Sequence, residues 1–188
     1  MASLPTRGRV GQRQRRMLEF ALVVIVIGLV VAVLIDRVQK VMVEAERASV
    51  VEVVGQLRAA LGMQVAKLVA EGDTRRLARL QGGNPMQLMA RPPASYAGTV
   101  TGPDSNLKPG HWYYDPKTHA LRYRVRRPDV FVTPAKPADE IRYRVVLVYR
   151  DSNGNGRYDG PPDQAYRVEL KPENAYHWII KGGKGGQE

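Results

Sequence analysis

The feature that most constrains this sequence is an uninterrupted apolar segment near its N-terminus. Residues 17–35 read MLEFALVVIVIGLVVAVLI and contain one charged residue, Glu19. At a rise of about 1.5 Å per helical residue, this segment covers about 28 Å, which is close to the hydrocarbon thickness of a bilayer. The sequence therefore predicts a single transmembrane helix.

The charges beside this segment predict its orientation. Residues 1–16 hold five arginines and no acidic residue. Under the positive-inside rule, this surplus keeps the N-terminus in the cytoplasm and sends the remainder of the chain across the membrane. Polar residues follow the span directly in place of the small residues of a cleavage site, which favours a retained anchor over a removed signal peptide. The arginines nearest the span, which we expect to fix the topology, are Arg13, Arg15 and Arg16.

An amphipathic helix is predicted to continue beyond the span. Apolar residues recur there at steps of three and four, with charged residues mostly between them. Nothing that breaks a helix separates the two stretches, so one helix is expected from about residue 17 to residue 71, ending at Gly72. The apolar positions of the second stretch are Val50, Val54, Leu57, Leu61, Val65 and Leu68.

The C-terminal half of the chain is rich in turn residues and β-formers. A hairpin is predicted over residues 111–125, and alternating apolar residues predict further strands at 141–149 and 165–170, whereas 96–110 is expected to be a loop. Antiparallel strands with one apolar face need a cover, and the apolar stripe of the long helix can supply it. The arginines expected on the other face predict a basic, solvated surface that could contact acidic partners, phospholipid headgroups or DNA. They are Arg122, Arg124, Arg126, Arg142, Arg144 and Arg167.

These elements predict an α+β fold in which a long N-terminal helix packs on a small antiparallel β-sheet. The first half of that helix is transmembrane and the second half is amphipathic. The predicted organisation is a basic cytoplasmic leader at 1–16, a transmembrane helix at 17–35, an amphipathic helical region at 36–81, a sheet domain at 82–181 and a disordered tail at 182–188.

This arrangement resembles type IV pilins and the pseudopilins of type II secretion systems. A basic leader precedes the sequence Leu18-Glu19-Phe20-Ala21, an apolar helix follows, and a small sheet comes last. In that family a peptidase cuts after a glycine, and the glutamate is fifth in the mature chain. Aligning Glu19 there puts Gln14 at the glycine position and Arg15 at the mature N-terminus, so cleavage is not carried over to this chain.

Glu19 is the most specific residue of the resemblance. A carboxylate within hydrocarbon is costly, by about 2.5–3.5 kcal/mol at mid-membrane and less near the interface, so it is expected to have a partner. In assembled pilins the corresponding glutamate pairs with the N-terminus of a neighbouring subunit, which implies a role in helix assembly. The alternative is a local ion pair with Arg15 or Arg16 in the headgroup region.

A second motif lies between the last two long predicted strands. Oxygen-bearing side chains at loop positions 1, 3, 5 and 9, with glycine at position 6, match the first nine positions of a calcium loop. Position 12 is Pro162, so the next residue would have to replace the usual glutamate. The alternative is an Asn-Gly turn chosen for backbone reasons alone. The tentative calcium ligands are Asp151, Asn153, Asn155, Arg157 through its carbonyl, Asp159 and Asp163.

No catalytic motif accompanies these features. The chain has no cysteine, and its three histidines lack the spacing of a zinc site. We expect a non-enzymatic, pilin-like structural subunit or assembly factor in the bacterial inner membrane, with a periplasmic C-terminal domain. Its expected partners are the bilayer, other pilin-like subunits and secretion or pilus inner-membrane components, and nucleic acid is not an expected partner. The alternative is an anchored periplasmic binding module that does not polymerise.

Overall fold

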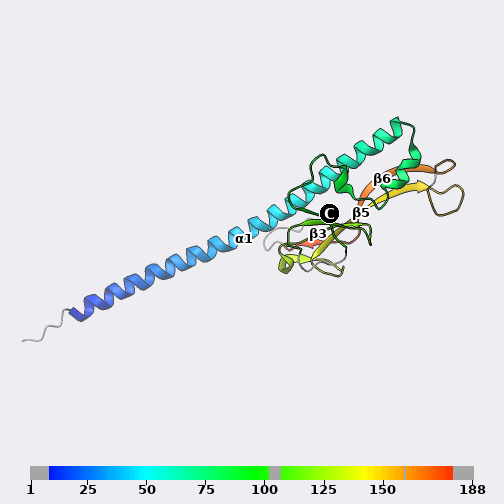
Figure 1. The fold of residues 1–188 in the computed structure, drawn as a ribbon. Coiled ribbons are helices and arrows are strands. Elements are labelled where there is room, and N and C mark those ends of the chain that lie inside the picture. Colours follow the sequence, from blue (N-terminus) through cyan, green and yellow to red (C-terminus); the bar gives the residue numbers. More distant parts are fainter. Residues whose placement is uncertain (1–8, 102–106, 159, 180–188) are drawn as a thin grey trace, which may run out of the picture. The chain divides into compact units, whose positions relative to one another are not determined.

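The computed structural model describes residues 9–101, 107–158 and 160–179 (Figure 1). The predicted tail at 182–188 and the first eight residues of the predicted leader lie outside the described residues. The chain divides into two compact units, Met1–Met42 and Val43–Glu188. Each unit is described by itself below.

The first unit contains the N-terminal part of helix α1, whose bounds are Arg9–Ala70. Its apolar side chains are exposed from Met17 to Ile35. In the described residues, α1 is the one helix long and apolar enough to cross a membrane, and none of its most apolar window is buried. This length and composition fit a membrane anchor, and they also fit a signal sequence.

The second unit is built on the remainder of α1. Apolar residues at three- and four-residue steps bury one face of this part of the helix, as the periodicity predicts. The helix ends where Gly72 adopts a left-handed φ of 72° and the Asp73 amide donates to the Leu68 carbonyl at 3.0 Å. The fully buried helix residues that join the main core include Val50, Leu57 and Leu61.

A five-stranded sheet packs against this face of the helix (Figure 1). The strand order is β1-β2-β3-β5-β6, and β4 and β7 form a separate two-stranded sheet. The strands are β1 (Tyr96–Thr99), β2 (Trp112–Asp115), β3 (Ala120–Arg124), β4 (Phe131–Val132), β5 (Glu140–Arg150), β6 (Gln164–Pro172) and β7 (His177–Trp178). The short 3-10 helices are η1 (Thr74–Leu80), η2 (Pro85–Leu88) and η3 (Pro128–Val130). The α+β class, with a long N-terminal helix packed on a small sheet, is confirmed.

The expectation of a wholly antiparallel sheet is wrong, because β1 pairs with β2 in parallel. The Trp112 amide donates to the Ser95 carbonyl at 2.8 Å, and the Val100 amide donates to the Tyr114 carbonyl at 2.9 Å. Parallel neighbours need a connection of about a dozen residues, which the chain between β1 and β2 supplies. A strand therefore occupies the start of the region that the sequence predicts to be a loop, and the sheet is mixed.

A second apolar cluster holds the far end of the sheet. Leu68 of α1, Leu77 of η1 and Leu147 of β5 pack with Tyr158, which lies in the β5–β6 connection. The Tyr158 ring also meets the Tyr149 ring edge-on, with 5.6 Å between the ring centroids. This contact fixes one side of the long connection that carries the predicted calcium motif.

Candidate functional site

Glu19 lies in α1 within the first unit and pairs with Arg15. The Arg15 Nε to Glu19 Oε1 distance is 3.3 Å, and both side chains are largely exposed. This is the local pairing that the sequence offers as one alternative, whereas assembly through Glu19 requires a second chain. Arg16 is exposed on the same helix, and Arg13 lies in the helix with its side chain outside the described atoms.

The β5–β6 connection forms an ordered loop around the carboxylate of Asp151. Asp151 Oδ1 accepts a hydrogen bond from the Gly154 amide at 2.7 Å, and Oδ2 accepts one from the Gly156 amide at 2.8 Å. These bonds, led by the one from Gly156, lower the pKa of Asp151 below its ordinary value. Both glycines have left-handed φ angles, 73° and 74°, which an L side chain rarely adopts. The glycines therefore let the chain wrap around one anionic group.

The two asparagines of the motif make matching turns inside this loop. Asn153 Oδ1 accepts from the Asn155 amide at 3.0 Å, and Asn155 Oδ1 accepts from the Arg157 amide at 2.8 Å. Such side-chain-to-backbone bonds are the turn chemistry that Asn favours. The arrangement therefore contains the features of the turn alternative in full.

Asp163 behaves differently from the rest of the motif because it is buried, with 5% of its surface exposed. Its Oδ1 accepts from the Ser152 amide at 2.9 Å, which closes the base of the loop. Its Oδ2 is buried and has no hydrogen-bond partner among the residues that the structure describes. A buried carboxylate oxygen without a donor is costly, and a cation at this position would relieve that cost.

The predicted calcium ligands are only partly brought together. Asp151, Asn153, Asn155 and Asp163 belong to one loop, whereas Asp159 lies outside the described residues. Within residues 9–101, 107–158 and 160–179, no three His, Asp or Glu side chains gather in a group that could hold a metal ion. The side-chain oxygens of Asp151, Asn153 and Asn155 accept backbone amides of the loop itself.

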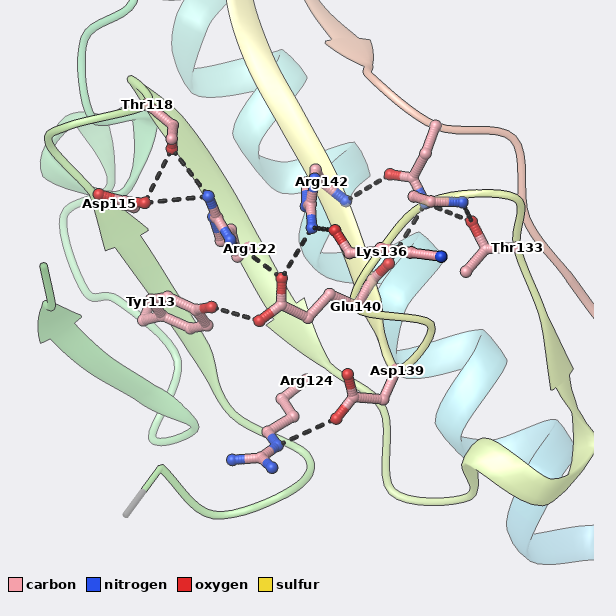
Figure 2. Close-up of polar contacts among 12 residues, drawn as sticks. Tyr113, Asp115, Thr118, Arg122, Arg124, Thr133, Lys136, Asp139, Glu140 and Arg142 are labelled. Carbon is pink, nitrogen blue, oxygen red and sulfur yellow. Dashed lines mark hydrogen bonds and ion pairs between the residues drawn. The ribbon is translucent and has the colours of Figure 1, made fainter. Parts of the chain in front are cut away.

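A buried ion cluster joins strands β2, β3 and β5 on the face of the sheet away from the apolar core (Figure 2). Arg122 contacts Asp115 Oδ2 through Nη2 at 3.0 Å and donates to Glu140 Oε2 through Nη1 at 3.1 Å. Tyr113 donates to Glu140 Oε1 at 2.5 Å, and Thr118 donates to Asp115 Oδ2 at 2.9 Å. All three charged residues are less than 10% exposed. The cluster pairs its charges with groups of opposite sign and cross-links three strands, while the buried Nε of Arg122 has no hydrogen-bond partner among the described residues.

The environment of this cluster shifts the pKa of its members. Burial, followed by the hydrogen bond to Glu140, raises the pKa of Tyr113. Burial also acts to raise the pKa of Asp115, but hydrogen bonds from Thr118 and the Lys117 amide, with the charge of Arg122, outweigh it and lower that pKa. Asp115 therefore stays ionised to a lower pH than an ordinary aspartate.

The expected basic, solvated face of the sheet is wrong for Arg122, which is buried, whereas Arg144 is half-buried, Arg167 is exposed, and both are paired with acidic residues. Arg122 is buried in the ion cluster, and Arg124 Nε lies 3.3 Å from Asp139 (Figure 2). The strand pattern did not predict that acidic residues also lie on this face of the sheet. These acidic residues pair with the arginines. The remaining pairs are Arg142 with Glu140 at 3.4 Å, Arg144 with Glu173 at 2.5 Å and Arg167 with Glu169 at 3.2 Å.

Glu46 is a further buried acid that the sequence pattern placed between apolar positions. It lies in α1, is 7% exposed, and accepts bonds from the Tyr123 hydroxyl at 2.9 Å and the Arg126 amide at 2.7 Å. It ties the helix to strand β3 and to the residues that follow it. The helical spacing from Glu46 to Val50, four residues, is the signal that could have placed it on the buried face.

An open groove of about 510 Å³ lies beside α1 and the edge strand β6. Arg58, Glu169 and Lys171 are its charged lining residues, and Glu169 is engaged by Arg167. The described lining holds no paired nucleophile and base.

Comparisons with protein-family models, with curated proteins and with solved structures found no significant match to this chain.

Proposed function

We propose that this chain is a pilin-like structural subunit or assembly factor of a type II secretion or type IV pilus system. The α1 segment of the first unit anchors it in the bacterial inner membrane, and the second unit lies in the periplasm. Lateral packing of apolar helices drives its association with other pilin-like subunits and with inner-membrane components of the machine.

The observation that supports this proposal is the continuity of α1. One helix supplies both a fully exposed apolar segment and the buried face of a small sheet. The first part of such a helix presents apolar side chains that can contact lipid. Its second part packs against the sheet of the second unit. The exposed apolar residues from Met17 to Ile35 form a continuous surface through which such a chain could associate.

Cysteine cross-linking tests the proposal directly, because the chain has no natural cysteine. A single cysteine at Val30, within the exposed apolar segment, should give disulfide-linked dimers in native membranes. The matched control is a cysteine at Ala97, an exposed position of the second unit, which should not give them. Equal cross-linking at the two positions, or none at Val30, would contradict assembly through the helix.

Orientation can be measured with the same variants. A membrane-impermeant thiol reagent added outside intact spheroplasts should label the Ala97→Cys variant. If this position is labelled only after membrane lysis, the second unit lies on the cytoplasmic side, which contradicts the proposed topology. Release of the protein by alkaline carbonate would instead contradict the anchor.

A second candidate function is an anchored binding module in which the β5–β6 loop takes calcium, and the unpartnered buried oxygen of Asp163 favours it. Asp151, Asn153, Asn155, the Arg157 carbonyl and Asp163 would hold the ion, with Asp159 completing the set that the sequence predicts. A cation that binds only the folded state stabilises it by about 2.7 kcal/mol when its concentration is 100-fold above Kd.

Thermal unfolding tests this second candidate. The full chain in detergent should melt several degrees higher in millimolar calcium than in chelator. The Asp151→Ala variant should show no difference between the two buffers. Equal melting temperatures for the unmutated chain would leave the loop as turn chemistry.

A further inference from the structure

The β5–β6 loop contains two Asn-Gly sequences, Asn153-Gly154 and Asn155-Gly156, in an exposed stretch. Asn-Gly is the dipeptide most open to spontaneous deamidation. In that reaction the backbone nitrogen of the glycine attacks the Cγ carbon of the preceding asparagine side chain, and glycine allows the approach because it has no Cβ. Two adjacent copies in an exposed loop are a chemical liability unless the fold restrains them.

The nitrogens that would attack are both held by Asp151. The Gly154 and Gly156 amides donate to the two oxygens of this one carboxylate, at 2.7 and 2.8 Å. Each nitrogen must lose its proton before it can act as a nucleophile. A neighbouring carboxylate disfavours that loss, since it stabilises the N–H by a charge-assisted bond and would repel the resulting amide anion.

The carbonyl groups that would be attacked are, by contrast, already polarised. Asn153 Oδ1 accepts from the Asn155 amide at 3.0 Å, and Asn155 Oδ1 accepts from the Arg157 amide at 2.8 Å. A donor at the carbonyl oxygen stabilises the negative charge that develops there during attack. Both asparagine side-chain carbonyls are therefore polarised for attack. What restrains the reaction is the hold of Asp151 on the two glycine nitrogens that would attack.

We propose that this loop is a latent site of covalent modification in which the Asp151 carboxylate protects both asparagines from deamidation. When the protection is lost, the glycine nitrogen gives up its proton and bonds to Cγ of the asparagine, and the side-chain nitrogen leaves as ammonia. Water then opens the resulting succinimide at one of its two carbonyl groups, which gives aspartate or isoaspartate.

The products would change the loop in two ways. Aspartate places a new carboxylate at loop position 3 or 5, beside Asp151. Isoaspartate inserts one additional methylene into the backbone and removes the side-chain geometry of the turn. The protection itself needs no bound cation, so it stands independently of the calcium proposal.

Peptide mass spectrometry tests the protection on the full chain in detergent. Trypsin cuts after Arg150 and Arg157, so a single peptide, residues 151–157, carries both sites. After incubation in mildly alkaline buffer and a brief digestion, Asp151→Ala should show deamidation several-fold faster than the unmutated chain at both asparagines. Its rate should approach that of the unmutated chain in denaturant.

The matched control is Asp163→Ala, which removes the other described carboxylate that closes the loop. Asp163 holds the Ser152 amide and neither glycine, so this variant should deamidate at close to the unmutated rate. Equal acceleration in both variants would show that general loosening is responsible, and an unchanged rate in Asp151→Ala would show that the carboxylate has no protective role. Either result overturns the proposal.

A second variant separates charge from folding. Asp151→Asn keeps the size of the side chain and removes its charge, and it should also accelerate deamidation several-fold at Asn153 and Asn155, which fragment ions distinguish from the asparagine introduced at position 151. Fluorescence of Trp112 and Trp178, both in the second unit, reports whether each variant remains folded. A folded Asp151→Asn variant with the unmutated rate would overturn the proposal.

Discussion

The carboxylate of Glu46 accepts a hydrogen bond from the Tyr123 hydroxyl at 2.9 Å, which links helix α1 to strand β3. The same Glu46 oxygen accepts the Arg126 amide at 2.7 Å. Burial, followed by the charge of Glu46, raises the pKa of Tyr123, so this phenol remains a donor throughout the range in which proteins are folded. One helical carboxylate therefore adds a polar link between the helix and the sheet of the second unit to their apolar packing.

Glu46→Ala should destabilise the full chain by about 1–3 kcal/mol, because it leaves the buried Tyr123 hydroxyl and the partly buried Arg126 amide without this acceptor. The matched control is Glu52→Ala, whose carboxylate is exposed and contacts Gln56 on its own helix. That change should stay within about 0.5 kcal/mol. Denaturant unfolding followed by tryptophan fluorescence measures both, and equal losses in the two variants would contradict the role of Glu46.

Arg122→Met should cost about 3 kcal/mol or more, because removal of one partner leaves Asp115 and Glu140 as uncompensated buried charges. Arg167→Met breaks an exposed pair with Glu169 and should cost about 1 kcal/mol or less. The same unfolding measurement compares them. If the two variants are equally stable, the buried ion cluster does not cross-link the strands.

Acid should weaken the second unit through Asp115. The folded-state pKa of Asp115 is lowered, so its contribution to stability is complete above the pKa of the unfolded chain and is lost as the pH falls through the folded value. The free energy of unfolding should therefore decline as the pH falls below the ordinary pKa of an aspartate. In Asp115→Asn this decline should be shallower, and an identical acid profile would exclude Asp115 as a source.

Glu19→Leu should leave the chain in the membrane and reduce its association with other helices. The change lowers the cost of insertion, so alkaline extraction should be unaffected, whereas cross-linking through a cysteine at Val30 should fall. Asp36→Leu makes the same type of change at the other end of the apolar segment and should leave cross-linking intact. Unchanged cross-linking in Glu19→Leu would reduce Glu19 to its local pair with Arg15.

The leader should remain attached to the protein in native membranes. Intact-mass measurement should give a chain that still contains Arg7 to Arg16, because Gln14 stands where the peptidase of pilin-like proteins needs glycine. A chain beginning at Arg15 with a methylated amine would contradict this prediction. Gln14→Gly, in a host that has the peptidase, is the complementary change and should produce that shorter chain.

Much of the fold could be predicted because it depends on local periodicity. The spacing from Val50 to Leu68 predicted the buried face of α1, and alternation along 141–149 predicted β5, which the structure extends by one residue at each end. The parallel strand β1 could not be predicted in the same way. This strand has only four residues, which is too few for a clear alternating pattern. Its parallel pairing with β2 depends on how the connecting chain runs and not on the residues of the strand itself.

The burial of charged residues is the feature that the sequence pattern was least able to predict. Alternation placed Arg122 on the polar face of β3, and that is the face it occupies. The pattern does not show that Asp115 and Glu140 arrive there from other strands and enclose it. The hairpin register, which sets Tyr113 opposite Arg122, was the available clue to the cluster. Pairing across strands therefore decides whether a charged position is solvated or buried.

Two ion pairs bracket the apolar part of α1: Arg15 with Glu19 at 3.3 Å, and Asp36 with Lys40 at 2.7 Å. The helical rise puts the two carboxylates about 25 Å apart along the axis. A typical hydrocarbon core is about 30 Å thick, so in a bilayer the paired side chains would extend outward to the headgroups or the bilayer would thin around the helix. Thinning costs energy around every isolated copy, and copies that share one thinned patch reduce that cost. If the chain is the membrane-anchored subunit proposed above, this mismatch in length would draw copies together before any specific contact forms between them.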